Sequence, residues 1–200
     1  MTLLEKRARD DPRRRETELA FLRATEDLLA EGASFADLNV SRIAERAGRT
    51  RTAFYAHFDD RRELLVRLVD DFSAEVYATT DQFWTGPVDR AAVEGVIVGL
   101  LGTFRSHATL LRAVVEASGY DREIREFWND GVVGRFRTAA EDRLRRDGRP
   151  PQEARALALA LVWMTERTGY QQIVGETGVP DRAVVAALTE VWTSALRTGD

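Results

Sequence analysis

Three side chains that could contact a nucleic acid lie close together in the first third of the chain: Arg51, Thr52 and Tyr55. Their guanidinium, hydroxyl and phenol groups suit hydrogen bonds to phosphates and to base edges in a DNA major groove. Such groups can read DNA only when a rigid helix holds them outward. The flanking sequence must therefore supply that helix.

Residues 39–58 have the layout of a helix-turn-helix, in which two short helices cross over a tight turn. The helices are expected at about residues 40–47 and 51–56. Asn39 and Thr50 precede them and are residue types that accept hydrogen bonds from the first free N–H groups of a helix. The spacing thus predicts a second helix that presents Arg51, Thr52 and Tyr55.

The turn between these helices is expected at Gly48, because glycine accepts a positive φ angle without steric cost. Ala44 and Ala47 are small enough to let the two backbones approach. The apolar face that should seal the pair against a preceding helix consists of Ile43, Ala53, Phe54 and Phe58.

Apolar residues recur at helical spacing along nearly the whole chain, which predicts an all-α fold. Nine helices are expected, at about residues 16–31, 40–47, 51–56, 60–83, 88–105, 109–118, 121–146, 152–174 and 181–197. The expected organisation is a basic N-terminal arm (1–15), a three-helix DNA-binding domain (16–58) and a larger helical ligand-binding and dimerisation bundle (59–200), with the helix at 59–84 connecting the two domains.

Charged residues are distributed unevenly along the chain, although its formal net charge at pH 7 is only −4. Residues 6–15 hold six basic and two acidic side chains, whereas residues 71–200 hold 15 basic and 19 acidic ones. Arg13, Arg14 and Arg15 could form an arm that reaches DNA phosphates or simply a solvated terminus. A neighbouring helix-turn-helix favours the arm.

Composition excludes several function classes. The chain has no cysteine and only two histidines, and it contains no HExxH, Gly-rich phosphate loop or nucleophile elbow. No cofactor, metal or enzymatic activity is therefore expected.

The longest unbroken apolar stretch, residues 96–104, is about half of what a membrane helix requires. With no apolar region behind the basic residues of 1–15, a cytoplasmic protein without a membrane partner is expected.

The run from Ala47-Gly48 through Phe54-Tyr55 and His57-Phe58 to residues 61–65 resembles the signature of the TetR family of transcription regulators. The resemblance implies DNA contacts at Thr50, Arg51, Thr52, Tyr55 and His57, with Arg61 where the family usually has a phosphate-binding lysine. The chain departs from the pattern at Arg49, usually aliphatic, and at Asp59-Asp60, where Pro-Ser is common.

Four C-terminal stretches, at residues 103–107, 126–128, 164–168 and 191–194, resemble the EthR type within that family. The resemblance implies an apolar ligand chamber, and the residues expected to line it are Leu100, Phe104, Trp128, Val162, Thr165 and Trp192. Spacing alone favours core packing for the tryptophans, and only the resemblance favours pocket lining for Trp128 and Trp192. Glu166-Arg167 is expected to be a structural ion pair or a helix-face charge, and His107 a helix-end or surface residue.

These features together favour a homodimeric regulator, usually a repressor in this family, that binds a pseudo-palindromic DNA site and is released by a small apolar molecule. The dimer interface is expected on the helices at 152–174 and 181–197. A helical DNA-binding protein without a ligand, regulated by a protein partner, is the alternative. An all-α enzyme is a weaker third possibility.

Overall fold

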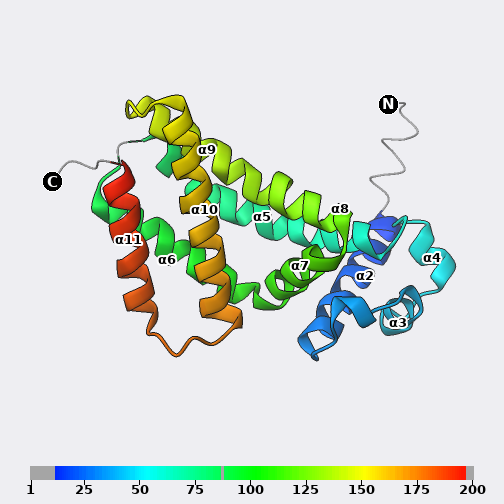
Figure 1. Cartoon of the computed structure of the whole chain (residues 1–200). Helices are drawn as coiled ribbons and strands as arrows, with labels where there is room; N and C mark the ends of the chain where they lie inside the picture. The colour runs from blue at the N-terminus through cyan, green and yellow to red at the C-terminus, as the bar shows by residue number, and fades with distance from the viewer. Residues whose placement is uncertain (1–11, 87, 197–200) are drawn as a thin grey trace, which may run out of the picture. The chain divides into compact units, whose positions relative to one another are not determined.

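The computed structural model describes residues 12–86 and 88–196, which are helical almost throughout and contain no β-strand (Figure 1). The all-α prediction is confirmed. The chain divides into two compact units, Met1–Val69 and Asp70–Asp200. The division falls inside a long helix, α5 (Arg61–Thr85), and not at residue 58 as the sequence suggested.

In the N-terminal unit, the described residues from 12 onward form three helices, a 3₁₀ turn and the start of α5. These elements are α2 (Pro12–Ala30), η1 (Phe35–Asp37), α3 (Val40–Arg46) and α4 (Arg51–Tyr55). The helix α2 begins at Pro12, where the fixed φ of proline suits the first helical position. This helix begins before the expected start at residue 16, so Arg13, Arg14 and Arg15 are helical. Residues 1–11 of the expected arm lie outside the described residues.

The C-terminal unit combines the rest of α5 with a bundle of further helices. These are α6 (Arg90–Ser106), α7 (Ala108–Tyr120), α8 (Arg122–Arg125), the π-helical segment η2 (Glu126–Val132), α9 (Val133–Arg146), α10 (Pro151–Val174) and α11 (Asp181–Leu196). Figure 1 shows α10 lying between α9 and α11, and α11 also packs on α6. Within the described ranges, no helix has the length and apolar character required to cross a bilayer.

One predicted helix, at about 121–146, is interrupted by a wider turn. The N–H of Val133 donates to the carbonyl of Trp128, five residues earlier, so the hydrogen-bond register is π-helical. Such segments rotate the following side chains relative to an α-helix and occur often at functional sites. The wider turn contains Trp128, whose side chain is buried.

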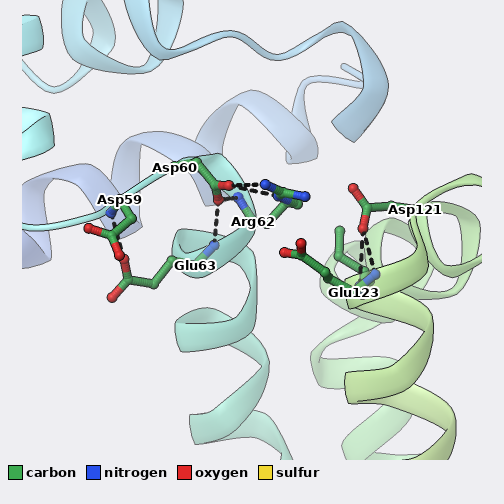
Figure 2. A network of polar contacts seen from close by, with 7 residues as sticks. Asp59, Asp60, Arg62, Glu63, Asp121 and Glu123 are labelled. Carbon is green, nitrogen blue, oxygen red and sulfur yellow. Dashed lines mark hydrogen bonds and ion pairs between the residues drawn. The ribbon is translucent and has the colours of Figure 1, made fainter.

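Helix ends in the C-terminal unit are fixed by local side chains. The carboxylate of Asp121 accepts hydrogen bonds from the N–H groups of Glu123 and Ile124 at the start of α8, as Figure 2 shows for the first of them. At the other end of the unit, Arg143 donates to the carbonyl of Gly86 just beyond α5, at 2.6 Å. Such bonds fix the end of α5 against α9.

Candidate functional site

The two short helices of the N-terminal unit are capped as the sequence predicted. The side chain of Asn39 accepts a hydrogen bond from the N–H of Arg42 at 3.0 Å, and Thr50 accepts one from Ala53 at 3.1 Å. Gly48 has a φ of +62°, the left-handed conformation that favours glycine. Local chemistry alone therefore sets where the second helix, α4, begins.

Aromatic packing orients α4. Phe54 is fully buried and meets Phe21 of α2 edge to face, with ring centroids 5.3 Å apart. Ile43 and Phe58 are also buried, whereas Ala53 is only half-buried. Burying one side of so short a helix leaves the opposite side facing outward.

The outward side of α4 carries the side chains expected to contact DNA. Thr50, Arg51 and Thr52 are exposed, and 52% of Tyr55 is exposed. Within the described part of the chain, the side chain of Arg51 makes no hydrogen bond or ion pair. The guanidinium of Arg51 is thus available to an external anion or base edge.

His57, also expected on DNA from the resemblance, lies differently. Its ring is half-buried beside Phe21 and Phe58, and its Nδ1 atom is buried without a hydrogen-bond partner. Burial, with a smaller effect from the Arg14 charge, lowers the pKa of His57 below its usual value. A neutral ring that packs on the aromatic core is the main role visible for His57.

Arg61 is engaged inside the N-terminal unit and not extended toward solvent. Its Nη1 atom donates to the carbonyls of Phe35 at 2.7 Å, Ala36 at 2.9 Å and Leu38 at 2.5 Å, and its guanidinium lies over the Phe35 ring. Those contacts satisfy the carbonyls of the turn that precedes α3. The expected phosphate contact of Arg61 has no support in this geometry.

The three arginines of the first helical turn lie on the exposed surface of α2. Arg14 donates to the carbonyl of Ala56, just after α4, at 3.0 Å. This bond joins the basic start of α2 to the end of α4. It places positive charge beside the face that carries Arg51 and Tyr55.

The two aspartates that depart from the family pattern, Asp59 and Asp60, directly precede α5 (Figure 2). Asp60 accepts from the N–H groups of Arg62 and Glu63 and from the Arg62 side chain. Burial acts to raise the pKa of Asp60, but these hydrogen bonds outweigh it and lower the pKa. Glu63 in turn accepts from the N–H of Asp59. Asp60 is therefore a helix cap, and Arg62 offsets its charge.

The C-terminal unit contains a partly open cavity of about 90 Å³, which is well above what a single water molecule needs. Its walls come from α5, α6, η2, α9, α10 and α11 and are almost wholly apolar. The lining residues are Phe72, Ser73, Val76, Thr80, Phe83, Trp84, Val93, Val96, Ile97, Leu100, Phe104, Trp128, Val132, Val133, Phe136, Val162, Thr165, Glu166 and Trp192.

All six residues expected to line a chamber are brought together in this cavity: Leu100, Phe104, Trp128, Val162, Thr165 and Trp192. The contribution of α5 was not foreseen, although Phe72, Val76 and Phe83 follow its apolar stripe. Phe72 stacks nearly parallel on Trp128, with an interplanar angle of 13°. Aromatic rings from several helices therefore contribute to a lining that suits an apolar ligand.

Glu166 also lines the cavity and is not a helix-face charge, whereas the alternative expectation, an ion pair with Arg167, is met. Only 5% of the residue is exposed, and its partner Arg167 approaches no closer than 3.7 Å. Burial raises the pKa of Glu166, an effect opposed in part by Arg167 and by the indole N–H of Trp128. Its position on the stripe that contains Val162 and Gly169 is the sequence signal that could have identified it.

Known proteins resemble the chain in both units. Residues 21–68 match the model of bacterial regulatory proteins of the tetR family, and residues 93–197 match that of the transcriptional regulator EthR, C-terminal domain. The HTH-type transcriptional regulator EthR of Mycolicibacterium smegmatis is 31% identical over 186 residues, covering 88% of this chain and 85% of the relative. EthR of Mycobacterium tuberculosis is 29% identical over 187 residues, covering 90% and 86%.

Solved structures show the same fold. A TetR-family regulator from Syntrophomonas wolfei has a TM-score of 0.72 at 14% identity, covering 91% of this chain and 96% of its own. A transcriptional regulator from Rhodococcus sp. Rha1 has a TM-score of 0.72 at 18% identity, covering 90% and 96%.

The family matches span both the helix-turn-helix and the helices around the cavity. They also agree with the expectation that the chain is not an enzyme, because the matched proteins are transcription regulators. The chain therefore belongs to the TetR family of DNA-binding transcriptional regulators, and its C-terminal domain is of the EthR type.

Proposed function

We propose that this regulator is a ligand-responsive repressor that binds a pseudo-palindromic DNA site as a homodimer and leaves it when a small apolar molecule fills the cavity. The observation that carries the proposal is the continuity of α5. This helix begins at Arg61 in the DNA-binding unit and later supplies Phe72, Val76 and Phe83 to the cavity wall. A ligand in the cavity therefore touches the helix that leads to the DNA-binding unit.

Release requires the ligand to bind the DNA-incompetent conformation more tightly than the competent one. Coupling of about 1–3 kcal/mol is typical of allosteric proteins and corresponds to about 5–150-fold in DNA affinity. A cavity whose wall includes α5 gives the ligand a direct means to favour one position of that helix.

DNA contacts are assigned to the outward side of α4 and to the start of α2. Thr50, Arg51, Thr52 and Tyr55 would enter the major groove, because they are the exposed side chains of the second helix of the motif. Arg13, Arg14 and Arg15 would contact phosphates, which hold the protein without reading sequence. His57 would at most add one ring nitrogen, and Arg61 is assigned to the fold.

The dimer interface is assigned to α10 and α11. Small or apolar side chains are exposed along α11 at Ala183, Ala187 and Val191, spaced so that they lie on one side of the helix. Leu159 on α10 is 47% exposed, and Val191 is 44% exposed. Two such helices from each protomer would bury these side chains in a four-helix bundle.

In vitro selection of DNA with the purified protein tests the first part of the proposal. The expected product is a pseudo-palindrome with half-sites one helical turn apart, about 34–36 Å. The selected duplex should bind more weakly as salt increases, with a slope that counts the phosphates neutralised. Failure to enrich any sequence at low ionic strength would contradict the assignment.

A further inference from the structure

Two residues that line the cavity carry buried polar groups with no hydrogen-bond partner among the described residues. These groups are the carboxylate of Glu166, both of whose oxygens are buried, and the indole N–H of Trp128. Each of the two residues is at most 5% exposed. The indole N–H of Trp128 lies near enough to the carboxylate to act to lower the pKa of Glu166. The two groups nevertheless do not meet in hydrogen-bonding geometry.

The two threonine hydroxyls among the lining residues already have hydrogen-bond partners. The hydroxyl of Thr165 accepts from the indole of Trp192 and donates to the carbonyl of Leu161, both at 2.8 Å. The hydroxyl of Thr80 donates to the carbonyl of Val76 at 3.2 Å. A ligand would gain little from either hydroxyl, because each already has an internal partner.

A buried donor and a buried acceptor without partners lower the free energy of unfolding. A ligand that forms hydrogen bonds with both therefore gains affinity. We propose that the cavity selects an apolar molecule with a neutral head group that both donates and accepts hydrogen bonds, such as a primary amide or a hydroxyl, held between Glu166 and Trp128. The head group would accept from the indole and donate to the carboxylate. This inference rests on the proposed ligand response and specifies its chemistry.

Other head groups fit the pair less well. A carboxylate placed beside Glu166 would require one of the two acids to be protonated. An ammonium could donate to Glu166 but could not accept from Trp128. A tertiary amide could accept but not donate, and it would leave the carboxylate buried without a hydrogen bond.

Isothermal titration calorimetry of the full-length protein, without DNA, tests this inference with octanamide, N,N-dimethyloctanamide and octanoate. The three probes share a similar apolar chain and differ in the head group. Octanamide is expected to bind about ten-fold more tightly than either of the others, which is the effect of about one satisfied buried hydrogen bond. Equal affinity for octanamide and its dimethyl analogue would overturn the inference.

Variants locate the effect. Trp128→Phe removes the N–H and keeps an aromatic ring, whereas Glu166→Leu removes the carboxylate; each should reduce the preference for octanamide to near unity. Trp84→Phe is the matched control, because Trp84 lines the same cavity; it should leave the preference unchanged. If Glu166→Leu does not fold, Trp128→Phe alone decides, and an unchanged preference in that variant contradicts the assignment.

The inference and the proposed function can fail separately. If octanamide binds with the expected preference but does not change DNA affinity, the proposed ligand response is contradicted. The recognition of the head group by Glu166 and Trp128 is then still supported. If all three probes release DNA with equal affinity, the proposed function is supported. The recognition by Glu166 and Trp128 is then contradicted.

Discussion

The indole N–H of Trp192 on α11 donates a 2.8 Å hydrogen bond to the hydroxyl of Thr165 on α10, and both residues are buried. Trp192 also packs edge to face against Phe83 and Trp84 of α5. The hydrogen bond therefore joins α10 and α11, the two helices assigned to the dimer interface. The ring of Trp192 also contacts α5. The hydrogen bond also removes Thr165 from the polar groups that a ligand could use.

Replacing Thr165 with Val should lower the free energy of unfolding by about 1–3 kcal/mol, because the Trp192 N–H would stay buried without a partner. Thr165→Ser keeps the hydroxyl and should lose less. Urea unfolding at one fixed protein concentration measures both variants. A Val variant as stable as the parent would show that this hydrogen bond contributes little.

Glu166 gives the C-terminal unit a dependence on pH. Its pKa in the folded protein lies above the ordinary value of 4.5, so between the two values the folded state holds a proton that the unfolded state has lost. Stability from this group is therefore full below that window and falls as pH rises through it. The glutamine side chain of the Glu166→Gln variant does not titrate, so this variant should not show the same loss of stability as pH rises.

The measurement is the difference in free energy of unfolding between Glu166→Gln and the parent at several pH values. This difference should shift in favour of the variant as pH rises from about 4 to 7, the range that begins near the ordinary pKa of a glutamate. Glu190→Gln on α11, where the residue is exposed, is the matched control for the substitution itself. A constant difference for Glu166→Gln would contradict the assigned burial.

Arg51 and Arg61 should separate DNA contact from folding. Arg51→Ala should weaken binding to the selected duplex by about 1–3 kcal/mol and leave the thermal transition almost unchanged. Arg61→Ala should lower the thermal transition, because three carbonyls lose a charged donor. Fluorescence anisotropy and thermal denaturation distinguish the two roles, and equal destabilisation by both variants would refute the division.

The helix-turn-helix was predictable because its signals are local. Asn39 and Thr50 cap helices through their own side chains, and Gly48 meets a backbone requirement that few other residues satisfy. Their roles therefore follow from residue type and spacing. The expectation for Arg61 had no such basis, because its carbonyl partners at Phe35 and Leu38 lie far away in the sequence.

The cavity was predictable only in part. An apolar stripe indicates that a helix face is buried but does not show whether the face packs tightly or leaves space. The family resemblance supplied Trp128 and Trp192, whereas the lining residues of α5 required the structure. The π-helical register around Trp128 was also missed, because it changes hydrogen-bond partners without leaving a distinct side-chain pattern.

Gly169 allows α10 to approach α6 closely. A Cβ atom at this position would lie 2.9 Å from the ring of Phe104, too close for an ordinary contact. Gly169→Ala should push that ring toward the cavity, lower the free energy of unfolding by about 1–3 kcal/mol and weaken octanamide binding. Calorimetry and urea unfolding measure the two effects.

Gly102 on α6 is the control for that change. It is exposed, and a Cβ atom there would meet nothing within 4 Å. Gly102→Ala should stabilise the protein by about 0.5–1 kcal/mol, because alanine loses less conformational freedom in a helix. Gly169→Ala that stabilises equally would mean that the α6–α10 contact is looser than these distances imply.

The most direct test of the regulator is the affinity of the selected duplex measured by fluorescence anisotropy with and without saturating octanamide. The account predicts that octanamide weakens DNA binding by about 5–150-fold, and that Trp128→Ala loses most of this response while it binds DNA like the parent without ligand. Unchanged DNA affinity when calorimetry shows the cavity to be occupied would contradict the coupling of ligand and DNA through α5.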